Sequence, residues 1–174
     1  DLVLTSLREA QADLKILSIH TGIEMKTSLE SGQRFMFERA LREGDVDLIL
    51  AHHPHIVRPV EYIRGKAIFY SLGNYLMVGA ANLTGRGPDT DYGLFGRAHF
   101  AWDARIQRLR LQAVEAVPLT NMHLQPRPLG TAEAAQRIQF LNSLSVQELG
   151  SAAMSFEIAQ NGFGVFCDRQ ELAF

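Results

Sequence analysis

The sequence has little of what marks a protein class by composition alone. Its 174 residues include one cysteine, Cys167, which excludes both an intramolecular disulfide and a zinc site of four thiolates. Lysine and arginine number 17 against 19 acidic residues, giving a formal net charge of -2. A nucleic-acid binder would show a basic face that neutralises phosphates, and this charge balance argues against one, so we expect no nucleic acid as a partner.

Long apolar runs are also missing. No stretch approaches the roughly 20 residues that span a bilayer, and no basic-then-apolar signal pattern stands at the start of the chain. We therefore expect no membrane segment in this chain. With 47% hydrophobic and 21% charged residues, the composition is that of a globular protein with a real core, and no composition break divides it into two domains.

Two short apolar runs separated by an amphipathic segment predict a strand, a helix and a second strand. Residues 14–19 form the first predicted strand, and residues 46–51 form the second. Between them, Ser28 is the expected N-cap of a helix that ends at Gly44. Such a unit is a βαβ crossover, so the two strands should run parallel, and a histidine follows each of them.

The remaining elements are predicted with simpler patterns. A helix over 2–12 opens the chain, and strands over 60–63 and 67–72 flank a turn at 64–66. A surface loop over 79–93 precedes paired strands over 94–102 and 108–117, with Ala98, Phe100 and Trp102 on one face and Leu109, Leu111 and Ala113 on one face of the partner. A helix opens at Thr131, and residues 152–159 and 163–166 suggest a further helix and a strand.

Histidines are concentrated at the ends of the two predicted parallel strands. His20, His52, His53 and His55 fall within 36 residues, and in open α/β sheets the carboxyl edge of the strands is where sites form. If the backbone is extended there, His53 and His55 aim at one point, and His20 can join them from the neighbouring strand. Imidazole suits zinc and iron, and manganese where carboxylates assist, while the alternative is a structural cluster.

The motifs SIHTGIE and LILAHHPHIVRPVEYIRGKAIFYSLGNY, separated by one helix, resemble those of the CapA family, which is linked to poly-γ-glutamate capsule synthesis. The resemblance covers roughly residues 10–145. It implies an α/β fold, the metallophosphoesterase-like α/β/β/α sandwich of calcineurin-like enzymes, represented here by its C-terminal half. The domain over residues 1–174 would then be partial, and we expect the chain, which starts at Asp1, to be part of a longer protein.

By this resemblance, the complete domain binds two divalent metal ions, of manganese, iron or zinc, and three residues of this chain are implied as ligands: His20, His53 and His55. His52 would contact a ligand or donate a hydrogen bond to a phosphoryl oxygen. Glu24 would orient His20, or else be a solvated loop carboxylate. Asn74 has a place in the family-like motif, and a turn residue at the end of a strand is its alternative role.

The implied function is that of a metal-dependent phosphoesterase-like hydrolase in capsule biosynthesis, located in the cell envelope or outside the cytoplasm. The family has three further motifs, one with an aspartate, one acidic and one with another histidine, and none of them is in this chain. We therefore expect the chain to be an enzyme only when an N-terminal half completes it, and to be inactive alone. The alternative is a non-catalytic envelope protein that handles an anionic polymer through Arg58, Arg64 and Lys66. The expected partner of the chain is an anionic polymer or a phosphorylated substrate. We also expect self-association through an uncovered sheet edge.

Overall fold

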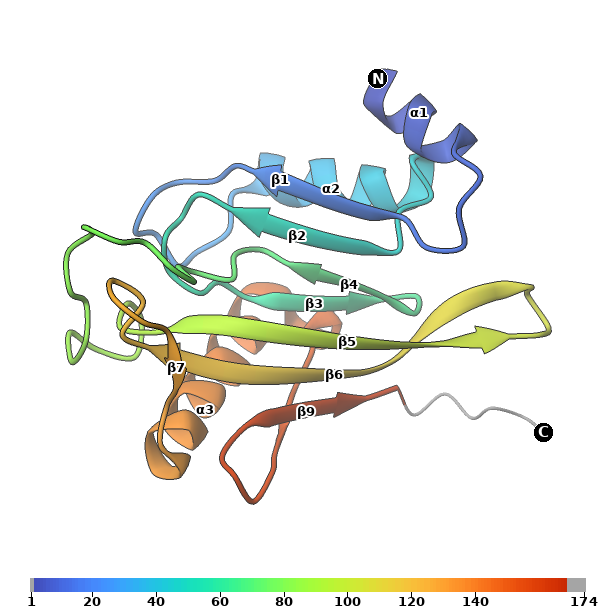
Figure 1. Cartoon of the computed structure of the whole chain (residues 1–174). Helices are drawn as coiled ribbons and strands as arrows, with labels where there is room; N and C mark the ends of the chain where they lie inside the picture. Colours follow the sequence, from blue (N-terminus) through green and yellow to red (C-terminus); the bar gives the residue numbers. More distant parts are fainter. Residues whose placement is uncertain (1, 169–174) are drawn as a thin grey trace.

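The computed structural model describes residues 2–168 as a mixed α/β protein with two sheets and flanking helices (Figure 1). The elements in chain order are α1 (Leu2–Glu9), β1 (Ile16–His20), α2 (Ser31–Glu43), β2 (Leu48–His52), β3 (Val60–Ile63), β4 (Lys66–Phe69), β5 (Gly93–Asp103), β6 (Arg108–Thr120), β7 (Arg127–Pro128), α3 (Thr131–Leu149), the 3-10 turn η1 (Gly150–Ala152), β8 (Glu157–Ile158) and β9 (Gly164–Cys167). Within residues 2–168, no helix has the length and apolarity needed to cross a membrane.

The first sheet has the strand order β1-β2-β4-β3 and contains the predicted crossover unit. β1 and β2 are parallel, with α2 between them in the chain, as the sequence predicted. β4 adds to β2 in parallel, and β3 pairs with β4 as an antiparallel hairpin. At its tip, Arg64 and Gly65 have φ angles of 52° and 80°, and positive φ at both central residues is the conformation that suits the twist of a two-residue hairpin.

Helix α2 begins at Ser31, so the expected N-cap at Ser28 is wrong. Glu30 is the residue before the helix, and its backbone is extended, with φ -86° and ψ 131°. The Ser28 carbonyl and the Glu30 carboxylate both accept hydrogen bonds from the Arg58 guanidinium. These contacts to Arg58 hold residues 28–30 outside the helix, and α2 therefore starts after them, at Ser31.

The second sheet has the order β5-β6-β9-β8, with β7 paired to β6. The β5–β6 hairpin was predicted, but the shared face expected for Leu109, Leu111 and Ala113 is wrong. Ala98 lies opposite Val114 and Phe100 opposite Leu111, so β6 has one extra residue between them. This bulge changes which residues face the core, and Val114 is therefore buried in place of the expected Ala113. Trp102, which was predicted to share a face with Ala98 and Phe100, is 51% exposed.

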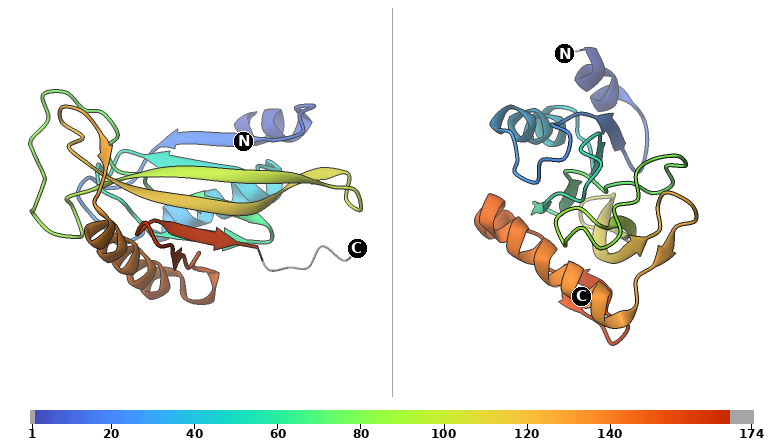
Figure 2. Two further views of the ribbon diagram at one scale, coloured as in Figure 1. Left: turned by 60° about the horizontal axis from the view of Figure 1, so that its bottom comes forward. Right: turned by 90° about the vertical axis from the view of Figure 1, so that its left-hand side faces the viewer.

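The two sheets contribute side chains to one core, which confirms the predicted α/β fold class. Leu48 and Phe69 of the first sheet share an apolar cluster with Leu111 of the second sheet and with Ile138 of α3. Along β2 the next residue, Ile49, belongs to a second cluster under α2, as strand alternation requires. Figure 2 shows the result: α2 lies on one side of the paired sheets and α3 on the other.

The chain after α3 does not continue as the helix expected over 152–159. Gly150 adopts a φ of 59°, which ends α3, and the chain then runs extended beside β3. Met154 donates its backbone N–H to the Val60 carbonyl at 2.8 Å, and Ala153 bridges to Glu61. Pairing with β3 therefore replaces the helix, while the strand expected over 163–166 is present as β9.

β1 is an edge strand of the first sheet. Among residues 2–168 its backbone pairs with β2 alone, and Ile16 on it is 48% exposed. An unpaired edge with an apolar side chain is a surface at which another strand can add. Self-association through this edge remains a prediction.

Candidate functional site

The parallel register of β1 and β2 brings two histidines side by side. His20 is the last residue of β1 and His52 the last of β2, and the two are direct register partners. The strands therefore deliver both imidazoles to the carboxyl edge of the sheet, the position at which open α/β sheets bind ligands. This placement follows from the crossover that the sequence predicted.

His53 and His55 reach the same edge by a route that the sequence did not indicate. The expected extended backbone is wrong: His53 has φ 101° and His55 has φ 61°, both in the left-handed region. Side chains with a Cβ disfavour this region, at a cost of about 1–3 kcal/mol for each strained residue. Such backbone persists where the surrounding structure determines it, and it gathers at functional sites.

The imidazoles of His20 and His53 are in direct contact. The His20 Nε2 and the His53 Nδ1 lie 2.9 Å apart, so one nitrogen donates a proton and the other accepts it. Their rings meet edge to face, with centroids 4.8 Å apart. The ring of His55 is 6.2 Å from that of His53, and its Nδ1 lies 2.7 Å from the Oδ1 of Asn74.

His52 points into a different contact from the other three. Its Nε2 lies 3.3 Å from the Ser18 hydroxyl, on the neighbouring strand. Burial lowers the pKa of His52, and the charge of the neighbouring His20 lowers it further. Both effects favour the neutral form of His52, in which one ring nitrogen carries a proton and the other accepts.

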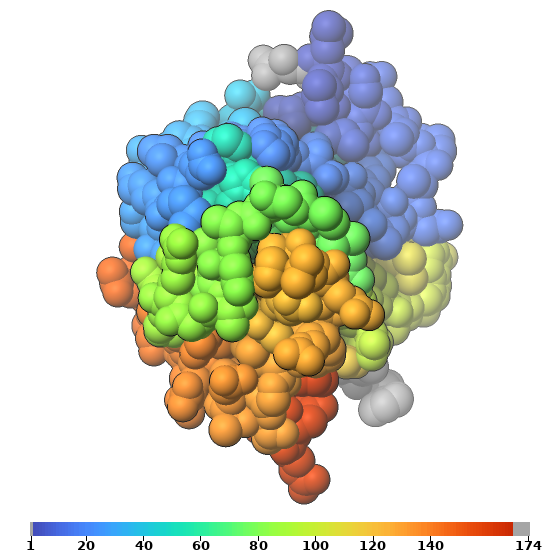
Figure 3. All heavy atoms as spheres, turned by 60° about the vertical axis from the view of Figure 1, so that its left-hand side comes forward, coloured from blue at the N-terminus to red at the C-terminus, as the bar shows by residue number. Residues whose placement is uncertain are grey.

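These residues line one open pocket of about 280 Å³. Its walls are formed by His20, His52, His53, His55, Gly73, Asn74, Tyr75, Leu76 and Met77. Of the predicted site residues, Glu24 alone lies outside: it is exposed in the β1–α2 loop, and the pocket lining does not include it. Figure 3 looks at this end of the molecule, where the green segment after Asn74 lies beside the orange segment around Met122.

Arg58 joins the loop that follows β2 to the segment between β1 and α2. Its side chain is fully buried, and its guanidinium donates to both Glu30 carboxylate oxygens at 3.1 Å and to the Gln33 side chain. The sequence suggested a basic surface residue here, so this role was missed. The neighbouring Gly22, with φ 123°, would place a Cβ 2.8 Å from the same guanidinium, which leaves no room for a side chain.

The donor types in the pocket suit a metal that binds imidazole. Two nitrogens that bind one ion at about 2.1 Å each stand roughly 3.0–3.4 Å apart, close to the separation of the His20 and His53 nitrogens. Across residues 2–168, no group of three or more His, Cys, Asp or Glu side chains stands at a geometry that holds a metal. The three predicted ligands thus lie in one pocket, with His55 turned toward Asn74.

Comparison with known proteins finds matches to the part of the chain that contains the pocket. Residues 2–78 match the family described as bacterial capsule synthesis protein PGA_cap. Over 78 residues, the chain is 35% identical to the PGA biosynthesis protein CapA of Bacillus subtilis (strain 168), a stretch that covers 44% of this chain and 20% of that protein. It is 30% identical over 69 residues to the capsule biosynthesis protein CapA of Bacillus anthracis, covering 40% of this chain and 16% of that protein.

The chain therefore aligns with a fifth or less of the length of these relatives. The resemblance was expected over residues 10–145. The matched segment starts earlier, at residue 2, and ends earlier, at residue 78. It includes every predicted site residue, from His20 to Asn74, and leaves β5 and all later elements outside the match. Over residues 2–78, the chain is therefore similar to the CapA proteins of bacterial capsule synthesis.

Proposed function

We propose that this chain is part of a metal-dependent, phosphoesterase-like hydrolase that acts in poly-γ-glutamate capsule biosynthesis at the cell envelope. The observation that carries the proposal is the 2.9 Å separation of the His20 and His53 nitrogens at the carboxyl edge of two parallel strands. The two relatives are named for PGA biosynthesis and for capsule biosynthesis, and the strained backbone of His53 and His55 supports a functional rather than a structural cluster.

In this proposal, His20 and His53 hold a divalent ion, and His55 completes the imidazole set. A bound ion would polarise a phosphoryl oxygen and lower the pKa of a water molecule. His52 stays neutral beside Ser18, so its single N–H is available as a donor only when the other ring nitrogen accepts from the serine hydroxyl. This defines one state in which His52 can donate to a substrate oxygen.

The described part of the chain has no carboxylate in the pocket lining. A pair of metals about 3.5–4 Å apart normally shares a carboxylate bridge, and imidazoles alone do not supply the negative charge that offsets two divalent ions. We therefore expect the isolated chain to bind at most one ion and to be inactive. A phosphatase assay on p-nitrophenyl phosphate with added manganese would contradict this if the chain turned over the ester.

The polymer-binding alternative has less support at the residues named for it. Arg58 is fully buried against Glu30, and Lys66 lies 3.5 Å from Asp45 and 3.8 Å from Asp47. Only Arg64, at the tip of the β3–β4 hairpin, is left exposed to meet a polymer. A single cation does not make a surface that selects an anionic chain.

Metal content of the purified chain tests the proposal. Elemental analysis should find near-stoichiometric manganese, iron or zinc in the parent chain, and the double variant His53→Ala/His55→Ala should lose it. His99→Ala is the matched control, because His99 bonds to Glu115 on the exposed face of β5 and should retain the metal. Equal metal in the parent and the double variant would refute a site at these histidines.

A further inference from the structure

We propose that Asn74 is a positioning residue that fixes the tautomer of His55. In this role, which rests on the proposed function, the amide keeps the His55 proton on Nδ1 and leaves the lone pair of Nε2 free to bind a metal or accept a proton. The contact that carries the proposal is the 2.7 Å separation of the His55 Nδ1 and the Asn74 Oδ1.

The chemistry of the contact determines the tautomer. An amide oxygen can accept a hydrogen bond but cannot donate one, so the His55 Nδ1 must carry the proton. A neutral imidazole has a single N–H, and Nε2 is then unprotonated. Ligating histidines commonly donate their second ring N–H to a carboxylate or a carbonyl, which sets the ring orientation and the basicity of the ligating nitrogen.

A backbone bridge brings the segments that carry the two residues together. Val57 forms an antiparallel bridge with Leu72, and Arg58 donates its N–H to the Ser71 carbonyl at 3.1 Å. His55 and Asn74 each lie two residues beyond this bridge, in the loops that follow β2 and β4. The bridge therefore brings the two loops together beside the contact between His55 and Asn74.

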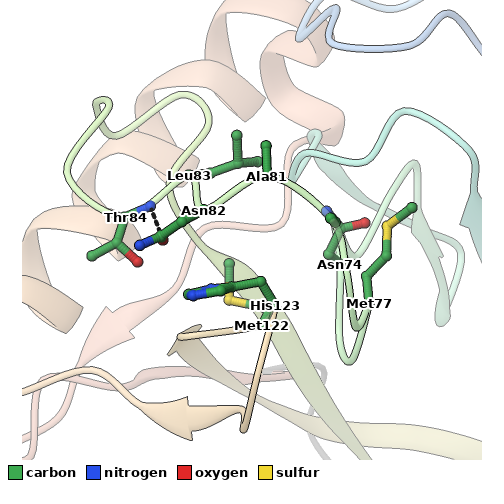
Figure 4. A pocket seen from close by; sticks show the side chains of 9 residues that line it. Asn74, Met77, Ala81, Asn82, Leu83, Thr84, Met122 and His123 are labelled. Atoms are coloured by element: carbon green, nitrogen blue, oxygen red, sulfur yellow. Dashed lines mark hydrogen bonds between the residues drawn. The ribbon is translucent and has the colours of Figure 1, made fainter.

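Asn74 is also held from its other side. Gly93, the first residue of β5, would place a Cβ only 2.0 Å from the Asn74 carbonyl oxygen, so the absence of a side chain there lets β5 pack against Asn74. Met77 follows three residues later and donates its N–H to the Met122 carbonyl at 2.8 Å. Figure 4 shows this flank, with Asn74 and Met77 on one side of a small neighbouring pocket and His123 and Met122 below it.

A turn residue would be the simpler role for Asn74. Such a residue bonds its own backbone or that of its neighbours. The hydrogen bond of this amide instead joins a histidine 19 residues away, in a different loop of the same pocket. The segment from Leu72 to Asn74 was read from the sequence as the end of a strand, and nothing local in it points to His55.

The test is the tautomer of His55, measured by long-range 1H–15N correlation NMR on the full 15N-labelled chain without metal. We expect the parent to show a protonated Nδ1 and a bare Nε2. Asn74→Ala should shift His55 to the opposite tautomer or to a mixture, whereas Asn74→Asp, which still accepts, should restore the parent pattern. Asn82→Ala is the control, because its amide bonds only to the Thr84 N–H within its own loop.

Metal affinity provides the second measurement, by titration of Mn²⁺ or Zn²⁺ into each chain. Loss of the Asn74 acceptor should weaken binding about 10- to 100-fold, with Asn74→Asp near the parent value. A protonated Nε2 in the parent would overturn the proposal whatever the variants do, and so would an unchanged tautomer in Asn74→Ala. The expected tautomer without any metal binding would refute the proposed function and leave the role of Asn74 intact.

Discussion

At the ends of β1 and β2 the polar residues are histidines, whereas at the starts of the same strands they are carboxylates and cations. Asp47, just before β2, is buried and accepts the backbone N–H of Lys15 at 2.9 Å. Asp45 and Asp47 together meet Lys15, Lys66 and Arg108. Each of these five charged side chains thus has a partner of opposite charge.

The histidine end differs in the partners of its side chains and in its backbone conformation. Imidazoles face other imidazoles and an amide, with no carboxylate in the described lining, and two of the histidines have left-handed backbone. The charged end contains groups that satisfy one another and stabilise the fold. The histidine end contains nitrogen donors and stored backbone strain, and that combination favours a binding role. This contrast is the reason for proposing the candidate site at the histidine end of the sheet.

The largest expected effect comes from removing the buried guanidinium of Arg58, which joins the loop after β2 to the segment before α2. Arg58→Met keeps the length of the side chain but leaves the carboxylate of Glu30, itself 23% exposed, without its main partner. We expect a loss of about 3 kcal/mol in the free energy of unfolding, because breaking a buried ion pair strands the remaining charge. Urea denaturation measures it, with Arg64→Met at the exposed hairpin tip as a control that should change stability by under about 0.5 kcal/mol.

A loss below about 1 kcal/mol in Arg58→Met would mean that solvent or another side chain replaces the guanidinium. The histidine end would then be independent of the buried pair.

Gly93→Ala should have the next largest effect, and it acts through Asn74. The new Cβ would fall 2.0 Å from the Asn74 carbonyl oxygen, so β5 or the Asn74 segment must move. We expect destabilisation of about 1–3 kcal/mol, as for other overpacked sites, together with a weakened contact between Asn74 and His55. Thermal unfolding and the His55 tautomer are the two measurements.

Gly32→Ala is the matched control for this substitution. Gly32 lies in α2, and a Cβ there meets nothing within 4 Å. Alanine is the better helix former by about 0.5–1 kcal/mol, so this variant should be slightly more stable than the parent. The same change would thus have opposite signs at the two glycines, and similar effects at both would contradict the close approach of β5 to Asn74.

The sequence predicted the elements that local patterns encode. The strand-helix-strand unit, the β3–β4 hairpin and the parallel strands ending in His20 and His52 all follow from periodicity and turn residues. The bulge in β6 was not predictable, because the extra residue is defined only by pairing with β5. The start of α2 was misplaced for a related reason: Arg58, 28 residues after Glu30, determines it.

The candidate site shows the same division. The grouping of the histidines was visible in the sequence, since strand ends meet at one edge of a sheet. The left-handed backbone of His53 and His55 was not, because neither residue is glycine and Pro54 between them suggested extended chain. The partnership of His55 with Asn74 depends on the Val57–Leu72 bridge, a contact between segments 15 residues apart.

The smallest expected effect lies at the charged end of the sheet, in the pH dependence of Asp45. Burial acts to raise the pKa of Asp45, but the hydrogen bond from Arg108 and the charges of Arg108, Lys66 and Lys15 outweigh it and hold the pKa below its usual value. A carboxyl group with a lowered folded-state pKa stabilises the protein above its unfolded-state pKa of about 3.9, and this contribution is lost as the pH falls through the folded-state value.

Asp45→Asn should therefore be less stable than the parent at pH 7, by under about 1 kcal/mol because the ion pairs are partly exposed. The difference in the free energy of unfolding should shrink below about pH 4 and vanish in stronger acid, where the parent carboxyl group is also protonated. Adding about 1 M NaCl at pH 7 should shrink it as well. A difference that stays constant from pH 7 into acid would assign the contribution of Asp45 to uncharged hydrogen bonds, and the charged end would then resemble the histidine end more closely than its residues suggest.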